Sequence, residues 1–285
     1  MTRLAPLAAL NTAPLFPILH GKLIQLLRAL GPADWERPTV AGAWRVRDVA
    51  AHLLDGELRT LAAHRDGHAL SAAEPPSTYE EVIRLIHQLN ATGVSHGARL
   101  SPRLLTDLLE VTGQWMSAFV AALDPDAPAL FPVAWAGESE SDNRLDTARE
   151  YTERWHHQMQ IRVALDDAGH RDVLLAPTLF HPLAETSVRA LPHAYRRTEA
   201  ADGATVVLRL TGEGPRSWTL RREGTRWCIY EGEVESPDAQ VSATPDVLWR
   251  LFFNALPDSE ARRALSLEGA APLIAPLLAA RSVMV

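Results

Sequence analysis

The sequence of 285 residues contains a single cysteine, Cys228. One thiol cannot form an intramolecular disulfide, and it excludes a cysteine-rich zinc knuckle. No apolar run approaches the roughly 18–20 residues of a membrane-spanning helix. The first twenty residues contain three prolines and no continuous apolar segment, so we expect no signal peptide. These absences predict a cytoplasmic protein.

The sequence also has fewer basic than acidic residues. Its 28 Lys and Arg and 35 Asp and Glu give a net charge of −7. This balance argues against a broad phosphate-binding surface, so nucleic acids and membranes are not expected partners. The glycine-rich phosphate loops and the G-x-S-x-G pattern of serine hydrolases do not occur. Hydrophobic residues make up 47% of the chain, which suffices for packed cores and excludes global disorder.

Hydrophobic residues recur at helical spacing through the first 170 residues. The pattern predicts helices at 15–30, 44–65, 79–96, 104–123 and 145–167, the last of them ending at Gly169. Residues 124–143 hold three prolines and a cluster of acids, which predicts a long connection.

The pattern changes after residue 170. A short helix near 178–191 is followed by alternation of apolar and polar residues, which is typical of strands. The expected strands lie at 205–210, around Trp218 and Leu220, and around Trp227 and Ile229, and the expected later helices at 246–254, 261–265 and 272–280. Glu223-Gly224 suits a tight turn between the last two strands. We therefore predict an α+β protein of two domains, an all-helical one at 1–170 and an α+β one with an antiparallel sheet at 171–285.

The densest group of potential metal ligands lies at 151–162. Glu153 and His157 are four residues apart, so they lie about 40° apart around a helix and ~6 Å apart along it, and both can bind one ion. His156 is an alternative to His157. Adjacent histidines are about 100° apart on a helix and are not expected to share an ion.

A second interpretation of this helix remains open. The apolar stripe that contains Trp155 and Met159 lies nearly opposite Glu153 and His157, as it would if the two polar residues formed a solvated helix face. His52, in the helix at 44–65, lies away from that helix's apolar stripe and taken alone suits a surface or helix interface. The remaining histidines outside 151–162 are expected at the surface or at helix ends.

Three further residues are given structural rather than chemical roles. Cys228 lies in an expected strand and is interpreted as a small buried hydrophobe rather than a nucleophile. Trp44 and Trp155 are interpreted as core residues that need no ligand to explain them.

The segment 44–53 resembles a known family. Trp44, Val46, Asp48, His52 and Leu53 match the W-x-V-x-D-x-x-x-H-L segment of the DinB-like metalloenzyme superfamily, most closely its mycothiol-dependent maleylpyruvate isomerase branch. The resemblance implies an up-down four-helix bundle in which a histidine of the second helix joins a Glu-x-x-x-His pair of the last helix around a divalent metal. The matching ligands here are His52, Glu153 and His157.

Residues 204–279 resemble the C-terminal half of the same family, which is similar to sterol carrier proteins. The resemblance rests on the strand at 206–210, Gly212-Glu213, Trp218, Pro237-Asp238-Ala239, the segment 248–251 and Glu268-Gly269. No catalytic residue of the isomerase's C-terminal half maps onto this sequence.

Two positions depart from the family pattern. Arg45 stands where the family often has a small hydroxyl residue that caps the helix. Gln160 stands where an aspartate commonly follows the last-helix histidine. Gln160 can still orient His157 or His52, but a neutral amide would not raise the basicity of a ligand as a carboxylate does.

The resemblance implies an enzyme that takes a small-molecule substrate and a low-molecular-weight thiol. Three protein ligands leave one coordination position open, as in catalytic zinc sites, and zinc is the default ion, although nickel, iron or manganese also accept such ligands. A thiol there would be deprotonated and could add to an electrophile, giving cis–trans isomerisation or thiol transfer, whereas water there would give hydrolysis. The alternative is a non-catalytic metal-containing protein whose C-terminal domain binds an apolar ligand.

Overall fold

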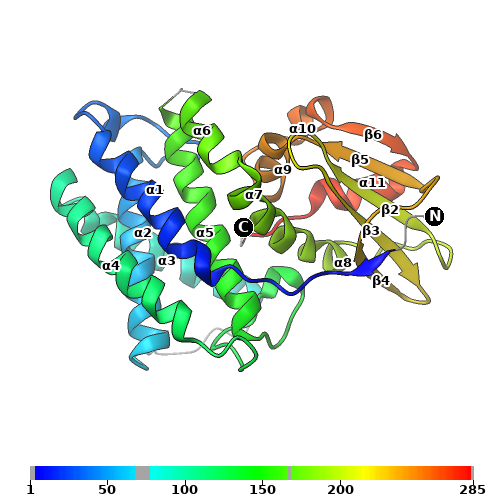
Figure 1. Ribbon diagram of the computed structural model, residues 1–285, viewed down its shortest axis with the longest axis horizontal. Coiled ribbons are helices and arrows are strands. Elements are labelled where there is room, and N and C mark those ends of the chain that lie inside the picture. The colour runs from blue at the N-terminus through cyan, green and yellow to red at the C-terminus, as the bar shows by residue number, and fades with distance from the viewer. Residues whose placement is uncertain (1–3, 69–77, 166–167, 284–285) are drawn as a thin grey trace. The chain divides into compact units, whose positions relative to one another are not determined.

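The computed structural model describes residues 4–68, 78–165 and 168–283 (Figure 1). The chain divides into two compact units. The helical unit comprises residues Thr12–Leu130 and Glu153–Leu174, and the mixed unit comprises Met1–Asn11, Phe131–Thr152 and Leu175–Val285. Each unit is described by itself.

The helical unit is a four-helix bundle with one additional long helix. Its elements are α1 (Phe16–Ala29), α2 (Val46–Thr60), α3 (Tyr79–Gly97), α4 (Pro102–Ala122), the second half of α5 (Asn143–Ala164) and most of α6 (Ala168–Leu175). The core cluster draws its helical residues from α1, α2, α4 and α5, including Leu27, Val49, Leu109 and Ile161. The five long helices predicted from the sequence are confirmed.

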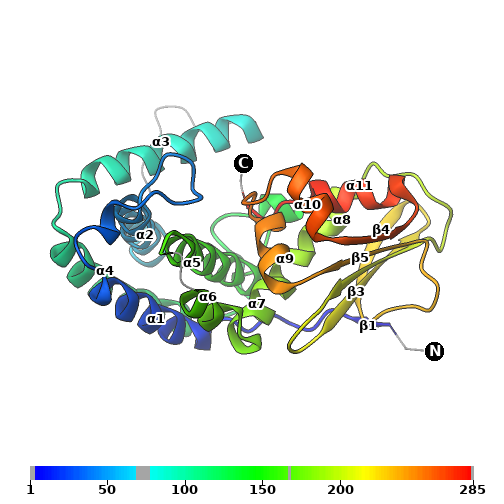
Figure 2. The same ribbon diagram turned by 90° about the horizontal axis from the view of Figure 1, so that it is seen from above.

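The extra helix, α3, packs on the outer side of α2 (Figure 2). Two glycines allow the close approach of these helices. A Cβ atom at Gly97 would lie 2.4 Å from Cβ of Ala51, and one at Gly93 would lie 2.2 Å from Cγ of Asp55. Larger residues at either position would push α3 away from α2.

The start of α2 explains part of its sequence motif. The carboxylate of Asp48 accepts a hydrogen bond of 2.9 Å from the backbone N–H of Arg45, the residue before the first helical turn. An acidic side chain at this position satisfies a free backbone donor and interacts favourably with the helix dipole. Asp48 therefore caps a helix that has no small hydroxyl residue at its N-terminus.

The mixed unit contains one six-stranded sheet in the order β1-β4-β3-β2-β5-β6. Its strands are β1 (Ala5–Pro6), β2 (Thr205–Leu210), β3 (Arg216–Glu223), β4 (Arg226–Glu231), β5 (Ala239–Ala243) and β6 (Ser266–Gly269). The predicted hairpin is present, with Glu223 paired to Arg226 across the turn. The sheet was predicted to be antiparallel, and one pair differs: β2 and β5 are parallel. The reason is that residues 232–238 cross from β4 to the edge of β2 away from β3, where β5 runs in the same direction as β4 and β2.

Helices of the mixed unit complete its core. They are α7 (Pro177–Ser187), α8 (Leu191–Ala194), α9 (Pro245–Phe252), α10 (Asp258–Ala264) and α11 (Ala271–Ala279). Contacts join α8 to β4 and α11 to β5. Trp218, Leu208 and Trp249 are fully or almost fully buried. The α+β fold class is confirmed.

Some boundaries differ from the predicted ones. α5 ends at Ala164, and Gly169 lies inside α6 rather than terminating the preceding helix. Residues 5–6 are not helical, because Ala5 and Pro6 pair with Glu231 and Tyr230 of the sheet. Residues 131–152 join the mixed unit through a core cluster that includes Val133. These compact units therefore do not follow a single boundary at residue 170, and the predicted domains 1–170 and 171–285 stay a prediction.

Among the helices of the described ranges, none combines the length and apolar character needed to cross a membrane.

Candidate metal centre

Three side chains predicted as metal ligands meet inside the helical unit. His52 projects from α2, and Glu153 and His157 project from successive turns of α5. One potential ligand atom of each lies within 4.8 Å of the other two. Nε2 of His52 is 3.0 Å from Nε2 of His157, and Nε2 of His157 is 3.5 Å from Oε2 of Glu153. Two helices distant in sequence thus bring two imidazoles and a carboxylate together.

The surroundings of α5 exclude a solvated helix face. Every residue from Trp155 to Arg162 is buried, and His157 is only 8% exposed. The interpretation as a solvated face is therefore wrong for His157, whereas Glu153 is partly buried, with a side chain 28% exposed. The physical reason is that His52 of α2 packs against His157 on the polar side of α5.

The alternative ligand His156 is buried as well. Its ring lies 3.9 Å from the ring of His157 between centroids, at an interplanar angle of 37°. Within the described residues, the group of side chains that could hold a metal contains His157 and not His156. The spacing to Glu153 left both adjacent histidines open as ligands, and the geometry favours His157.

Gln160 orients the His157 ring. Nδ1 of His157 lies 2.8 Å from Oε1 of Gln160, one turn further along α5. An amide oxygen can only accept, so Nδ1 carries the proton and donates. The lone pair of His157 is then on Nε2, the atom that faces His52. Gln160 therefore selects the tautomer that leaves Nε2 available to a metal, which is the arrangement seen around metal-bound histidines.

His52 is held in its neutral form. Burial, assisted by the neighbouring His157, lowers the pKa of His52 to about 2. A protonated imidazole has no lone pair for a metal, whereas a neutral one does. The Nδ1 atom of His52 is buried and has no hydrogen-bond partner among the described residues. The ring is therefore positioned by packing rather than by a hydrogen bond on its far side.

That packing comes from Trp44, which was interpreted as an ordinary core residue. The Trp44 ring lies 5.0 Å from the His52 ring and 6.5 Å from the His157 ring between centroids. Trp44 is only partly buried. It therefore forms a wall of the candidate metal centre, a role that hydrophobic periodicity alone does not reveal.

The spacing of these donor atoms fits a divalent ion. Two nitrogens on a tetrahedral zinc, with bonds of about 2.0–2.1 Å, lie about 3.3 Å apart, and adjacent nitrogens of an octahedral ion lie about 2.9 Å apart. The observed separation between His52 and His157 is 3.0 Å, so the imidazoles need little movement to bind one ion of either geometry. Nitrogen and carboxylate donors suit zinc and other first-row metals.

A buried ion pair one residue away from Glu153 went unnoticed in the sequence. Arg154 of α5 donates to the carboxylate of Glu57 on α2, and Thr112 of α4 donates to the other carboxylate oxygen. The Glu57 side chain is 1% exposed and that of Arg154 is 13% exposed. This network joins the two ligand-bearing helices to α4. Glu57 lies at helical spacing from Leu53 and Leu61, on the apolar side of its helix, so the pattern indicates its burial but not its pairing with Arg154.

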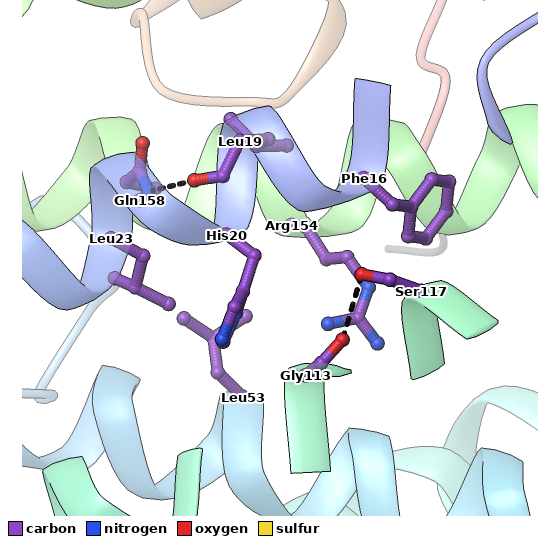
Figure 3. Close-up of a pocket in the computed structure, with 9 residues that line it drawn as sticks. All are labelled: Phe16, Leu19, His20, Leu23, Leu53, Gly113, Ser117, Arg154 and Gln158. Carbon is purple, nitrogen blue, oxygen red and sulfur yellow. Dashed lines mark hydrogen bonds between the residues drawn. The ribbon is translucent and has the colours of Figure 1, made fainter. Parts of the chain in front are cut away.

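A small cavity lies between α1, α2, α4 and α5 (Figure 3). His20, predicted as a surface residue, lines it together with Arg154 and Gln158. Gln158 donates to the backbone oxygen of Leu19, while its own Oε1 is buried without a partner among the described residues. The cavity has room for about one water molecule.

Cys228 lies on β4 of the mixed unit and is partly buried. Burial and the neighbouring Glu223 raise the pKa of its thiol. A thiol with a raised pKa is mostly protonated at neutral pH and is a poor nucleophile, as predicted.

The sequence of the helical region matches a known protein family. The model of the mycothiol maleylpyruvate isomerase N-terminal domain matches residues 16–162. The chain belongs to this family. The match spans just over half of the chain and contains His52, Glu153, His157 and Gln160. The resemblance inferred from the segment 44–53 is confirmed.

Solved structures similar to this family member were also found. A crystal structure of a mycothiol-dependent maleylpyruvate isomerase is 12% identical, with 90% of this chain and 91% of that chain covered and a TM-score of 0.49. A mutant of the mycothiol-dependent isomerase, with the same identity and coverage, gives a TM-score of 0.45. A UbiJ-SCP2 ubiquinone synthesis protein is 19% identical, with 38% of this chain and 93% of that chain covered and a TM-score of 0.25. A comparison with curated proteins found no match.

Proposed function

We propose that this protein is a divalent-metal-dependent enzyme that uses a low-molecular-weight thiol to act on an electrophilic small molecule. The observation that carries the proposal is the convergence of His52, Glu153 and His157 within 4.8 Å in the helical unit. Membership of a family named for mycothiol and maleylpyruvate supports mycothiol as the thiol and a cis–trans isomerisation as the reaction. Transfer of the thiol to the electrophile is the second outcome of the same chemistry.

Each residue has a distinct task in this proposal. His52 and His157 offer Nε2, Glu153 offers a carboxylate oxygen, and one coordination position stays open, with zinc as the default ion. Gln160 keeps the proton of His157 on Nδ1, and Trp44 keeps the His52 ring in place by packing. When bound, the ion would lower the pKa of a thiol beside it.

The proposed isomerisation needs no reactant besides the substrate and the thiol, and the thiol is regenerated. The sulfur lone pair forms a C–S bond to one carbon of an activated double bond, and the π electrons move onto the conjugated carbonyl oxygen. The remaining single bond rotates. Return of the electrons re-forms the double bond in the trans arrangement and expels the thiolate. If the adduct is instead protonated on carbon, the product is a thioether.

The first experiment measures metal content. We expect about one equivalent of a divalent ion in purified protein and its loss in His52→Ala and His157→Ala. His87 is an exposed histidine of α3, so His87→Ala serves as the matched control and should keep its metal. Metal retained in both ligand variants would refute the ligand set.

The second experiment tests whether the protein catalyses the proposed reaction. The metal-loaded protein is mixed with mycothiol and either maleylpyruvate or a panel of activated alkenes and epoxides, and products are identified by mass spectrometry and NMR. We expect an isomer or a thioether that the metal-free protein does not produce. If the protein binds metal but forms neither product, the proposed enzymatic activity is wrong, although the proposed metal centre is not.

A further inference from the structure

A second polar contact joins the two helices that carry the candidate metal ligands. Arg154 of α5 donates to the carboxylate of Glu57 on α2. The other contact is the one between Nε2 of His52 and Nε2 of His157. From the second of these contacts to the first, residue numbers rise along α2 and fall along α5. The two helices therefore run antiparallel and touch through polar side chains at two separate points.

The two contacts leave α2 in different directions. His52 and Glu57 are five residues apart, which places them about 140° apart around the helix and ~7.5 Å apart along it. On α5, Arg154 and His157 are about 60° apart around the helix and ~4.5 Å apart along it. A rotation of α2 about its axis, or a shift along that axis, therefore cannot leave both contacts unchanged.

The contact between Glu57 and Arg154 is held from two further helices. Oγ1 of Thr112 on α4 donates to the other carboxylate oxygen of Glu57. The guanidinium carbon of Arg154 lies 5.5 Å from the ring centroid of Phe16 on α1. Figure 3 shows the Arg154 side chain among residues of α1 and α4. The pair is thus enclosed in the interior of the bundle, and its side chains have little freedom to adjust.

We propose that the contact between Glu57 and Arg154 positions the metal ligands, because it sets the rotation and register of α2 against α5. The distance between the Nε2 atoms of His52 and His157 then depends on two side chains that lie outside the group of candidate ligands. This inference rests on the proposed function, since it concerns the same metal centre.

Apolar packing alone does not fix the helices as closely as a metal requires. Hydrophobic burial is non-directional, so it tolerates small rotations of one helix against another. A charge-assisted hydrogen bond has a narrow range of lengths and angles, and a buried polar residue can fix the register of packed helices. Metal–ligand bonds tolerate deviations of only about 0.2 Å. A directional contact about one turn from the ligands meets that requirement.

The first test measures zinc affinity by competition with a chelator in the double variant Glu57→Leu/Arg154→Met. This variant leaves no uncompensated buried charge, but it lacks the directional contact. We expect its affinity to fall about tenfold, the lower end of the range for residues that support metal ligands. Arg154→Lys keeps a cation opposite Glu57 but loses the planar fork of the guanidinium, so its affinity should lie between those of the wild type and the double variant.

Leu27→Ala is the matched control for a loss of stability. Leu27 is a buried residue of α1 in the same core cluster, and its truncation weakens the bundle through a cavity without removing a polar contact between α2 and α5. Leu27→Ala should bind zinc like the wild type at temperatures where circular dichroism shows it to be folded. An equal loss of affinity in Leu27→Ala and the double variant would mean that affinity follows stability, and the positioning role would be wrong.

The wild type separates this inference from the proposed function. If the wild type binds zinc and both the double variant and Arg154→Lys bind it equally well, the positioning role alone is wrong. A wild type that binds no zinc would refute the proposed metal centre and this inference with it.

The second test examines the arrangement of the ligands. Co²⁺ replaces zinc, and its visible absorption depends on the number and geometry of its ligands. We expect the spectrum of the double variant to differ from that of the wild type, and the spectrum of Leu27→Ala to match it. Arg154→Lys provides the same measurement if the double variant does not fold. Identical spectra with and without the contact would show that α2 keeps its position without it and would overturn the proposal.

Discussion

The Nε2 atoms of His52 and His157 lie 3.0 Å apart, although 105 positions separate the two residues. Because Nδ1 of His157 donates to Gln160, Nε2 of His157 carries a lone pair. The hydrogen bond between the two rings therefore requires a proton on Nε2 of His52. With the proton of His52 moved from Nε2 to Nδ1, the Nε2 lone pairs of both rings would be available to a divalent cation, with the carboxylate of Glu153 beside them.

Gln160 should control metal affinity without touching the metal. Gln160→Ala removes the acceptor for Nδ1 of His157, so the tautomer and ring orientation are no longer fixed. We expect the affinity for Zn²⁺ to fall about 10–100-fold, measured by competition with a chelator. Gln160→Asp should retain or raise the affinity, because a carboxylate increases the basicity of the imidazole.

Gln88 provides the matched control for that experiment. It is an exposed glutamine of α3, and Gln88→Ala should bind zinc like the wild type. If Gln160→Ala also binds like the wild type, the inferred role of Gln160 is wrong.

The buried pair of Glu57 and Arg154 should be strongly coupled. Glu57→Leu or Arg154→Met alone leaves one uncompensated buried charge, and each should lower the free energy of unfolding by about 3–5 kcal/mol. The double variant leaves neither charge, so its loss should be far smaller than the sum of the single losses. Urea denaturation measures all three variants.

An exposed ion pair supplies the comparison. Arg65 and Asp66 are paired at 2.7 Å with side chains 41% and 50% exposed, so Asp66→Asn should leave the free energy of unfolding nearly unchanged. If the loss of unfolding free energy in the double variant equals the sum of the two single losses, the charges of Glu57 and Arg154 are not coupled.

His20 should make stability fall in mild acid. Burial is the largest cause of its lowered pKa, with Arg154 acting in the same direction against Glu57 and Glu110. Below pH ~6.5 the unfolded chain binds a proton that the folded chain does not, so the free energy of unfolding decreases by up to about 1.4 kcal/mol per pH unit until the folded pKa is reached. Above pH 6.5 this contribution is constant.

The measurement is the pH dependence of unfolding for the wild type and His20→Gln. His52, whose pKa is also lowered, contributes equally to both proteins and cancels in the difference. The variant should lose less stability between pH 6.5 and 5 than the wild type. Parallel curves would contradict the burial of a neutral His20.

Local sequence predicted the long helices well because their apolar spacing is repeated over several turns. Spacing alone left His156 and His157 both open as partners of Glu153. The resemblance of the segment 44–53 to the isomerase family implied His52, Glu153 and His157, and the structure brings these three side chains together. The motif around Asp48 has a local explanation too, because its carboxylate caps α2.

Tertiary pairing could not be predicted in the same way. β1 has two residues, and β5 consists of Ala-Gln-Val-Ser-Ala, so neither carries the alternation of large apolar residues that identifies a strand. They are strands because β4 and β2 offer them hydrogen-bonding edges. The pairing of Glu57 with Arg154, a residue 97 positions away, likewise has no local signal in the sequence.

Anomalous diffraction from crystals of the purified protein, recorded on both sides of the zinc absorption edge, tests the central claim most directly. The account predicts one strong peak, with bonds of about 2.0–2.2 Å to Nε2 of His52, Nε2 of His157 and an oxygen of Glu153. A peak coordinated by other residues, or none between these three side chains in protein loaded with zinc, would contradict it.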